Sequence, residues 1–439
     1  MNTKALRQKI LDLAIHGKLV PQDPNDEPAS VLLERIRDEK ERLIKEGKIK
    51  RPKKAKATSD KPHYENVPFE VPSSWVWTTL GEIFTLQAGK NITAKDIYTE
   101  KSEEYKYPCF GGNGIRGYVA ISNKIGEYPI IGRQGALCGN INLAHGSFYA
   151  TEHAVVVERY CDTDLMWGYY TLIALNLNQY ATATAQPGLA VNVINDVAIP
   201  LPPLHEQQRI SKSLKILFSF LDAIECEKLY LKTAISQTKT KVLDLAIHGR
   251  LVPQDPTDEP ASELLKRINP KAEITSDNGH YQKLPEGWVI TPMQTLCALV
   301  DGEKQNGIER INLDVKYLRG EREAKVLTSG KYTAANTLLI LVDGENSGEV
   351  FRAPVDGYQG STFKQLSIHE EMYTDYVLQV INLHRKTLRE NKVGSAIPHL
   401  NKKLFKAINV PIPPYEEQKR IVNAINQTFT ILDTIMENL

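Results

Sequence analysis

The sequence predicts an α+β protein in which two mixed α/β domains are separated by a long antiparallel coiled coil of helices, in a pseudo-two-fold circular arrangement. Three observations predict this fold. Two internal repeats interleave along the chain, a run of apolar heptads lies in its middle, and two domain-sized segments contain short apolar strands.

The two repeats overlap in an informative way. Residues 11–36 and 243–268 are identical at 22 of 26 positions, and IPLPPLHEQQRI at 199–210 returns as VPIPPYEEQKRI at 410–421. In the middle of the chain, the proline-led repeat (199–210) leads into the other repeat (243–268). At the ends the two are separated, because the proline-led copy (410–421) lies near the C-terminus and the other copy (11–36) lies near the N-terminus. The two termini together therefore rebuild the central segment, as expected for an approximate two-fold axis with chain ends that meet.

The composition is that of a soluble globular chain with room for several domains. The 439 residues are 41% hydrophobic and 24% charged, with a formal net charge of +1. No apolar stretch approaches the length of about 18 residues that a membrane span needs, and the N-terminal segment lacks a signal-peptide core. Five scattered cysteines without a C-x-x-C pair fit reduced thiols and give no metal site. We therefore expect a cytoplasmic protein.

The central segment 204–248 predicts one long helix with a coiled-coil seam. Eight of its ten heptad a and d positions are apolar, and Gly249 follows the last turn as an αL cap would. The terminal segments carry matching apolar stripes, and Gly17 ends the first of them in the same way. A plain amphipathic helix on a domain core is the alternative. The predicted seam consists of Leu6, Ile10, Leu13, Leu214, Leu217, Leu221, Ile224, Leu231, Ile235, Val242, Leu245, Ile421, Ile425, Leu432 and Ile435.

A proline-broken turn, LVPQDP, follows each of these glycines. Asp26 and Asp258 are predicted to cap the next helix, with Pro28 or Pro260 in its first turn. After the first copy, residues 48–62 carry seven Lys or Arg against one Asp. Such a run is typical of a solvated linker, and beside a DNA-binding domain it can also contact phosphates.

The two segments between the repeats are alike only at their ends. Trp75 and Trp288 align near their starts, and each segment closes at a glycine before the proline motif. A mixed α/β fold is indicated by helices near 164–178 and 372–390 and by strands such as YPIIGR, HAVVVER, TLLILVDG and FKQLSI. The predicted divisions are 1–62 for the N-terminal helical part with its basic linker, 63–203 for the first domain, 204–279 for the helical spacer, 280–414 for the second domain and 415–439 for the C-terminal helix.

This layout resembles the specificity (S) subunit of type I restriction–modification systems over the whole chain. The motifs that carry the resemblance are P-L-P-P-x-x-E-Q at 200–207, P-I-P-P-x-E-E-Q at 411–418, L-P-E-G-W at 284–288 and the LDLAIHG-x-LVPQ pair. The resemblance implies that the two α/β domains are target-recognition domains, each contacting one half of a bipartite, asymmetric double-stranded DNA sequence.

The resemblance also implies partners. The helical spacer would set the distance between the half-sites and dock two modification (adenine methyltransferase) subunits, which join restriction–translocase subunits. S-adenosylmethionine, ATP and Mg²⁺ would belong to those partners, so no cofactor is expected on this chain.

Candidate DNA contacts lie in glycine-punctuated and polar loops of both domains. Arg suits guanine and Asn or Gln suits adenine in the major groove, Lys suits phosphates, and glycine lets the backbone approach a groove. Plain hairpin turns are the alternative for any one residue. The candidates are Asn113, Arg116, Arg133 and Gln134 in the first domain, and Lys304, Gln305, Asn346, Ser347, Arg352, Gln359, Lys364 and Gln365 in the second.

Candidate docking residues for partner subunits recur in both copies of the proline-led repeat. An acid in the first turn of a helix also suits the helix dipole without any partner. The same side chains, presented twice by the pseudo-symmetry, would meet two partner subunits. These candidates are Glu206, Gln207, Arg209, Glu417, Gln418 and Arg420.

The sequence contains no catalytic motif, so we expect a chain that is not itself an enzyme. The nearest match to the polar-P-P-aromatic motif of adenine methyltransferases is 412–415, where Ile412 cannot hold the amino group of a flipped base. No Walker A sequence is present. His16 and His248 precede the capping glycines, which favours a role at the helix end. The alternatives are a self-contained methyltransferase–nuclease and a coiled-coil scaffold with ligands other than DNA.

Overall fold

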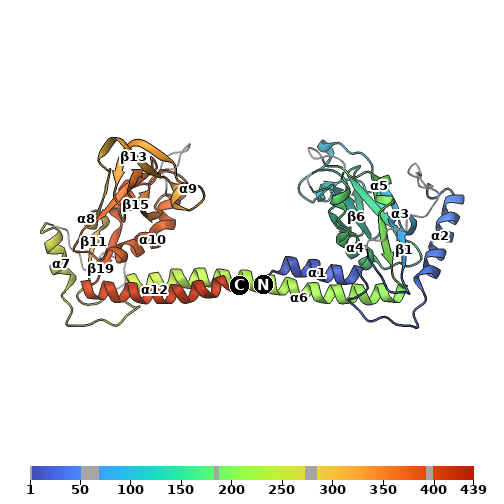
Figure 1. Cartoon of the computed structure of the whole chain (residues 1–439), viewed down its shortest axis with the longest axis horizontal. Helices are drawn as coiled ribbons and strands as arrows, with labels where there is room; N and C mark the ends of the chain where they lie inside the picture. Colours follow the sequence, from blue (N-terminus) through green and yellow to red (C-terminus); the bar gives the residue numbers. More distant parts are fainter. Residues whose placement is uncertain (1, 51–68, 136, 182–186, 272–283, 392–398) are drawn as a thin grey trace. The chain divides into compact units, whose positions relative to one another are not determined.

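A single helix of 44 residues, α6 (Leu204–Ile247), occupies the middle of the sequence. In the computed structural model (Figure 1) the chain divides into two units, Met1–Glu227 (unit 1) and Lys228–Leu439 (unit 2). The first half of α6 therefore belongs to unit 1 and the second half to unit 2. The structure describes residues 2–50, 69–135, 137–181, 187–271, 284–391 and 399–439.

In unit 1 the first half of α6 packs antiparallel to α1 (Thr3–Ile15), as Figure 1 shows. Near the start of α1, the Arg7 guanidinium lies 5.1 Å from the centre of the Phe218 ring. Towards the end of α1, Leu11 lines a small cavity together with Leu214. Residue numbers rise along α1 as they fall along α6, which makes the pair antiparallel.

In unit 2 the second half of α6 packs antiparallel to α12 (Tyr415–Glu437). The Lys239 ammonium lies 5.0 Å from the centre of the Phe429 ring, and Lys228 donates a hydrogen bond to the carbonyl oxygen of Leu439. Each half of α6 thus has a terminal helix of its own unit as partner, and the helix pairing expected from the heptads is present within each unit.

The predicted seam is only partly buried. In the middle of α6, Ile224 and Leu231 are 36% and 37% exposed, and Leu6 and Ile435 of the terminal helices are exposed as well. The structure leaves these four side chains exposed, so the prediction that they lie in a buried seam is wrong for them. The buried seam residues are Ile10, Leu214, Leu221, Ile235, Val242, Ile421 and Ile425, and the half-buried ones are Leu13, Leu217, Leu245 and Leu432.

The glycine caps predicted for the two repeated helix ends are confirmed. Gly17 and Gly249 have φ angles of +66° and +65°. The amide after each glycine bonds to the carbonyl five residues earlier, at 2.8 and 2.9 Å, which is a Schellman-type ending. A Cβ at these positions would also lie 2.6 Å from Pro72 and 2.3 Å from Pro285. Backbone conformation and packing therefore both require glycine here.

The LVPQDP turns lead into α2 (Ala29–Lys45) and α7 (Ala261–Ile268). Among the described residues, no side chain accepts a hydrogen bond from the N-terminus of either helix. The prediction that Asp26 and Asp258 cap these helices is therefore wrong, and both carboxylates form ion pairs with arginines instead. Most of the predicted basic linker, 51–62, lies outside the described residues.

The α/β domain of unit 1 contains sheets in the orders β2-β9-β6-β7 and β4-β3-β8-β5 and a ribbon of β1 with β10. Val155, Val156 and Val157 of β9 are fully buried, because β9 is an inner strand whose two faces are both covered. The strands are β1 (Val76–Thr79), β2 (Thr85–Ala88), β3 (Tyr107–Gly111), β4 (Gly114–Val119), β5 (Lys124–Ile125), β6 (Tyr128–Gly132), β7 (Ile141–Ala144), β8 (Ser147–Ala150), β9 (Ala154–Glu158) and β10 (Ala198–Leu201). The helices are α3 (Leu80–Ile83), η2 (Ala94–Asp96), α4 (Leu165–Ala174), η3 (Leu177–Tyr180) and α5 (Val191–Asn195).

The α/β domain of unit 2 has a related but different layout. It contains a sheet in the order β12-β18-β15-β16, a small closed barrel of β13, β14 and β17, and a ribbon of β11 with β19. Its strands are β11 (Val289–Pro292), β12 (Cys297–Val300), β13 (Lys304–Leu313), β14 (Val326–Thr333), β15 (Leu338–Leu341), β16 (Val350–Arg352), β17 (Gly357–Gln359), β18 (Phe363–Ile368) and β19 (Asn409–Ile412). Its helices are α8 (Met293–Leu296), α9 (Val315–Leu318), α10 (Thr374–Glu390) and α11 (Lys402–Ala407).

The elements predicted from short sequence patterns are confirmed. The strands expected at YPIIGR, HAVVVER, TLLILVDG and FKQLSI are β6, β9, β15 and β18, and the helices expected near 164–178 and 372–390 are α4 and α10. Among the described residues, no helix combines the length and the apolar character needed to cross a membrane.

Candidate nucleic-acid interface

Two glycine-rich loops of unit 1 meet at the ends of their strands. The turn 111–114 joins β3 to β4, and the loop 133–140 joins β6 to β7. A Cβ on Gly132 would lie 1.8 Å from the carbonyl oxygen of Gly112, and a Cβ on Gly112 would lie 2.6 Å from that of Gln134. Only glycine permits backbones to approach so closely. The glycines of FGGNG and IIGRQG therefore bring the two predicted reading loops together.

The two loops surround an open hollow of about 650 Å³. Asn113, Arg116 and Gln134 line it, so the structure brings together three of the four contacts predicted for this domain. All three side chains are exposed, and the exposed apolar side chains of Ile115 and Leu137 lie beside them. Amide and guanidinium groups next to apolar groups are what base edges and thymine methyl groups require.

The fourth candidate, Arg133, does not line the hollow. Its backbone N–H donates to the carbonyl of His153 at 3.0 Å, and its carbonyl accepts from Leu189 at 2.8 Å. The side chain is half-buried, and its Nε has no hydrogen-bond partner within the described residues. Arg133 thus anchors the loop through its backbone, and its guanidinium stays close to the protein surface.

Sequence reasoning missed His153, which also lines the hollow of unit 1. Its Nε2 lies 3.2 Å from a carboxylate oxygen of Glu152. His153 Nδ1, the other Glu152 oxygen and Asn142 Nδ2 are buried atoms that find no partner in the part of the chain the structure describes. Buried polar atoms are nearly always hydrogen-bonded in a complete assembly. No sequence signal marked His153, because it follows a turn and belongs to no repeated or glycine-rich pattern.

The loop after β15 in unit 2 repeats the backbone pattern of the loop after β6 in unit 1. The loop after β15 lies in LVDGENSGEVFR (341–352), and the loop after β6 begins in IIGRQG (130–135). Gln134 and Asp343 hold the same place in their loops, and each forms an isolated β-bridge, with Gly188 and His399 respectively. In unit 1 the backbone N–H of Gly139 donates to the carbonyl of Gly132, and that of Leu189 donates to Arg133. The corresponding bonds of unit 2 run from Gly348 to Leu341 and from Leu400 to Val342, and all four measure 2.7–2.8 Å.

The predicted contacts within the unit 2 loop are less accessible than expected. Ser347 is 0% exposed, and its hydroxyl finds no hydrogen-bond partner among the described residues. It corresponds to the buried Cys138 of unit 1, so this position faces inward in both loops. The prediction of a base contact by Ser347 is therefore wrong for this conformation. Its neighbour Asn346 is half-buried.

Two further candidates of unit 2, Gln359 and Lys364, belong to a polar network of the domain itself. Asp301 accepts from Lys331 at 2.7 Å and also pairs with Lys364. These hydrogen bonds hold the pKa of the Asp301 carboxyl well below its usual range. Gln359 is 9% exposed and donates to Asp301 and to the carbonyl of Phe363. Gln359 is therefore not available to a base, and Lys364 shares the Asp301 carboxylate with Lys331.

Gln365 is also occupied internally. Its Nε2 donates to the carbonyl of Tyr332 at 2.7 Å and to the Thr333 hydroxyl at 3.0 Å, which ties β18 to β14. Lys304 on β13 is exposed and forms no ion pair among the described residues, so it keeps its candidacy for a phosphate contact. Gln305 beside it is half-buried.

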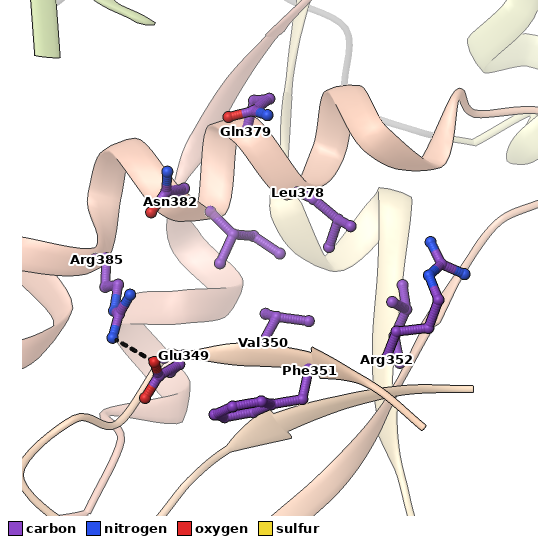
Figure 2. Close-up of a pocket in the computed structure, with 11 residues that line it drawn as sticks. Glu349, Val350, Phe351, Arg352, Leu378, Gln379, Asn382 and Arg385 are labelled. Atoms are coloured by element: carbon purple, nitrogen blue, oxygen red, sulfur yellow. Dashed lines mark ion pairs between the residues drawn. The ribbon is translucent and has the colours of Figure 1, made fainter. Parts of the chain in front are cut away.

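Arg352 lies apart from the other candidates of unit 2. It lines a groove of about 330 Å³ between β16 and α10, and Figure 2 shows it at the opposite end from the ion pair of Glu349 with Arg385, which measures 3.1 Å. Its guanidinium donates to the carbonyl of Asn336 at 3.3 Å and lies 3.8 Å from Asp375. Neither neighbour is in the loop after β15, so the structure does not bring Arg352 together with the loop residues.

The predicted docking residues form two matching buried junctions. Glu206 is fully buried, and its carboxylate accepts from the Trp75 indole N–H at 2.9 Å and from the Gln22 amide at 2.6 Å. Burial raises the pKa of Glu206 above its ordinary value. In unit 2 the same contacts link Glu417 to Trp288 and Gln254, each at 3.0 Å, and burial likewise raises the pKa of Glu417.

The adjacent glutamine of each repeat ties the helix start to the α/β domain. Gln207 accepts from the backbone N–H of Asp164 at the start of α4, at 3.0 Å, and donates to the carbonyl of Pro202. Gln418 accepts from the N–H of Tyr373 at the start of α10, at 3.1 Å. Both glutamines are fully buried.

The junctions are completed by an ion pair in each unit. Arg209 binds Asp26 and Arg420 binds Asp258, with closest N–O distances of 2.6 Å. These six residues therefore join the helix start, the LVPQDP turn and the α/β domain of their own unit. The four buried ones, Glu206, Gln207, Glu417 and Gln418, cannot present a docking surface in this conformation, which corrects that prediction.

Comparison with known proteins identifies relatives. The family model for the type I restriction modification DNA specificity domain matches residues 72–235 and 285–439. The specificity subunit of the Escherichia coli type I restriction enzyme EcoprrI is 44% identical over 167 residues, 38% of this chain and 41% of that protein. The EcoEI specificity subunit, also from Escherichia coli, is 31% identical over 382 residues, 68% of this chain and 62% of that protein. The chain thus spans less than two thirds of either relative.

A solved structure has the same fold. It was described under complex assembly and conformational transition of the type I R-M system, and it is 16% identical to this chain. The alignment covers 84% of this chain and 94% of that one, with a TM-score of 0.55. At this identity the likeness concerns the fold alone. It supports the mixed helix-and-sheet fold with one long helix that the repeats predicted.

Proposed function

Because this chain belongs to the family of type I restriction–modification DNA specificity proteins, we propose that it is the sequence-reading subunit of such a system. One observation of the structure carries the proposal most directly. In unit 1, exposed Asn113, Arg116 and Gln134 from two separate loops gather around one open hollow. Side chains of this kind, held by rigid backbone, are suited to reading base edges in the major groove.

We further propose that each unit reads one half of a bipartite, asymmetric sequence in double-stranded DNA. The loops after β6 and β15 share a backbone pattern but carry different side chains, Gln134 in one and Asp343 in the other. Unlike readers on related scaffolds give unlike half-sites. The proposed spacer between them is α6 with α1 and α12, in the pseudo-two-fold arrangement that the repeats predict, and its length would set the half-site separation.

The chain is proposed to act without a catalytic centre of its own. Two modification subunits would supply adenine methylation with S-adenosylmethionine, and restriction–translocase subunits would supply the steps that need ATP and Mg²⁺. Since the predicted docking residues are buried, the proposed docking surface is instead the exposed apolar side chains of α6, such as Ile216 and Phe220 in unit 1 and Leu229 and Tyr230 in unit 2.

The test measures methyl transfer and sequence selection together. The purified chain, alone and with its modification subunits, is incubated with labelled S-adenosylmethionine and a randomised duplex library. We expect methylation only when the modification subunits are present, and only on duplexes that share a two-part sequence. Methylation by the chain alone would identify a self-contained enzyme. Absent or salt-insensitive DNA binding, even with the partners, would favour a scaffold with another ligand.

A further inference from the structure

The loop of unit 2 carries an acidic side chain where unit 1 carries its predicted base reader. Asp343 and Gln134 occupy the same turn position, as the matching backbone bonds show. Gln134 lines the hollow of unit 1. If the loops of both units face DNA, the side chain of Asp343 therefore approaches it from the position that Gln134 occupies in unit 1. This step rests on the proposed function.

Asp343 does not stand alone in its loop. Its Oδ1 lies 2.6 Å from Nδ1 of His399, which enters from the segment before α11. The two side chains are 32% and 53% exposed. Within the described residues, Asp343 Oδ2 and His399 Nε2 have no hydrogen-bond partner. The pair is thus internally ordered and presents two unused polar atoms to solvent.

The pair has no evident structural task in the turn. The backbone N–H of Asp343 lies 3.3 Å from the carbonyl of Thr362, and that of Gly348 closes the loop on Leu341. The aspartate therefore does not cap the turn with its side chain. In unit 1 an uncharged glutamine at this place accompanies the same backbone pattern, so the fold of the loop does not require a carboxylate.

A carboxylate on a DNA-facing loop has few favourable partners. It is repelled by every phosphate, so it lowers affinity unless it meets a hydrogen-bond donor. In the major groove the base donors are the amino groups N4 of cytosine and N6 of adenine. Adenine also places its N7 acceptor beside N6, whereas cytosine offers its amino group alone.

We propose that Asp343, oriented by His399, is the specificity-determining residue of unit 2, and that it selects a base pair whose cytosine or adenine amino group faces the loop. Asp343 Oδ2 accepts from that amino group. His399 is a positioning residue that fixes the carboxylate by holding Oδ1. The unit whose predicted glutamine and serine contacts are buried thus reads through a pair that sequence reasoning overlooked.

The experiment compares Asp343→Asn with a matched charge control, Glu345→Gln, on the same loop. Glu345 is exposed, and its substitution removes the same charge two residues away. The full chain with its modification subunits is bound to a randomised duplex library, and the bound duplexes are sequenced. Both variants should bind unrelated DNA more tightly, because one negative charge is lost. Only Asp343→Asn should lower the preference at one base pair of one half-site, by about 5- to 150-fold.

Each outcome decides the question. Loss of preference at a single C·G or A·T pair supports the proposal and names the base. A preference unchanged in Asp343→Asn, as in Glu345→Gln, overturns it. His399→Ala should relax the same base pair, and relaxation at a different pair would overturn the assignment of His399 as a positioning residue. The other base pairs of the same half-site report on the folding of unit 2, since their selection should be retained in all variants.

Failure of this inference is distinguishable from failure of the proposed function. If the unsubstituted complex selects no sequence, the proposed function fails as a whole. If it selects a two-part sequence and Asp343→Asn selects the same one equally well, only the role of Asp343 is refuted.

Discussion

The two units share their internal joints and differ in their exposed loops. Glu206 accepts from a tryptophan indole and a glutamine amide at 2.9 and 2.6 Å, and Glu417 accepts from the equivalent tryptophan and glutamine of unit 2 at 3.0 Å each. The loops after β6 and β15 keep their backbone bonds, yet Gln134 in one is replaced by Asp343 in the other. A duplicated protein with the proposed function of reading two unlike sequences needs this division, because the joint fixes where a loop lies and the loop side chains determine what it contacts.

The buried residues are the ones that cannot vary independently. Glu206 accepts hydrogen bonds from Trp75 and Gln22 at the same time, so replacing Glu206 removes a partner from both. An exposed loop residue has no such constraint. The comparison therefore predicts large effects on stability at the joints and in the helix pairs, and smaller, sequence-dependent effects on DNA selection in the loops.

The largest expected effect concerns the helix pair of unit 1. Leu221→Asp places a carboxylate at a site that is 4% exposed, and we expect the free energy of unfolding of unit 1 to fall by about 3–5 kcal/mol. The matched variant Leu231→Asp alters a seam position that is exposed, and it should cost less than about 1 kcal/mol. Chemical unfolding and sedimentation of the two variants check this difference. Equal destabilisation by the two variants would contradict the difference in burial between Leu221 and Leu231.

The buried carboxylates give the next largest effect, and both units should show it. Glu206→Ala leaves the Trp75 indole without its acceptor and removes one of the two acceptors of the Gln22 amide, at a cost of about 2–4 kcal/mol in unfolding free energy. Glu417→Ala should cost a similar amount in unit 2. Trp75 and Gln22 bind different carboxylate oxygens, so Glu206→Gln keeps an acceptor for only one of them and should cost less than Glu206→Ala. If only one unit responds to its alanine substitution, the two joints are not energetically equivalent.

The same joints predict a pH dependence with a definite sign. Burial raises the folded-state pKa of Glu206 and Glu417, so the folded chain holds protons that the unfolded chain releases. The stability contributed by these groups is fully present below the unfolded pKa and is lost as the pH rises through the folded pKa. In the double variant Glu206→Gln, Glu417→Gln, this decrease should disappear from unfolding curves measured over that range. An unchanged pH profile would show that other groups cause it.

The two units differ in one buried contact, which Lys40 forms in unit 1. Lys40 on α2 is buried and donates to the carbonyls of Gly81 at 2.6 Å and Phe84 at 2.7 Å, which fastens α2 to the end of α3. The repeat places Ala272 at the corresponding position of unit 2, outside the described residues. Lys40→Met should destabilise unit 1 by about 2–3 kcal/mol, because these carbonyls lose their donor. Unfolding that leaves unit 2 unaffected would confirm that this fastening belongs to unit 1.

Lys40 also predicts a pH effect opposite to that of the glutamates. Burial lowers its pKa to about 8, so between this pH and the ordinary lysine value the unfolded chain binds the proton and the folded chain does not. Stability should therefore rise with pH across that interval in the unsubstituted chain and not in Lys40→Met. Parallel unfolding curves for the two proteins above pH 8 would contradict the lowered pKa.

The sequence alone predicted the parts of this fold that leave a periodic or repeated trace. The helix ends at Gly17 and Gly249 and the long helix between the domains follow from spacing and from the repeat. The roles of Glu206 and Asp26 did not, because a charged residue in a first turn has the same sequence signature whether it faces solvent or a buried indole. Burial depends on what packs over the residue, and here that partner is more than 100 residues away.

Sequence reasoning brought the candidate residues together in one unit and scattered them in the other for a related reason. In unit 1 the predicted loops contain glycines that a close backbone approach requires, so the sequence indicated which segments meet. In unit 2 residue type guided the choice, and Gln359 is buried in the network around Asp301 while Asp343 is only half-buried. Amide side chains suit adenine and protein carboxylates equally, so residue type does not distinguish a base contact from an internal one.

The smallest effect in energy is the most selective one. Gln134→Ala removes an exposed amide from the hollow of unit 1, and we expect it to leave stability unchanged and to reduce discrimination at one half-site by about 1–3 kcal/mol. Sequencing of duplexes selected by the complex checks this. Because the two units read separately, the other half-site should be selected as before. Equal weakening of DNA binding on every sequence would show that Gln134 contacts phosphates. The proposed base reading by unit 1 would then depend on Asn113 and Arg116.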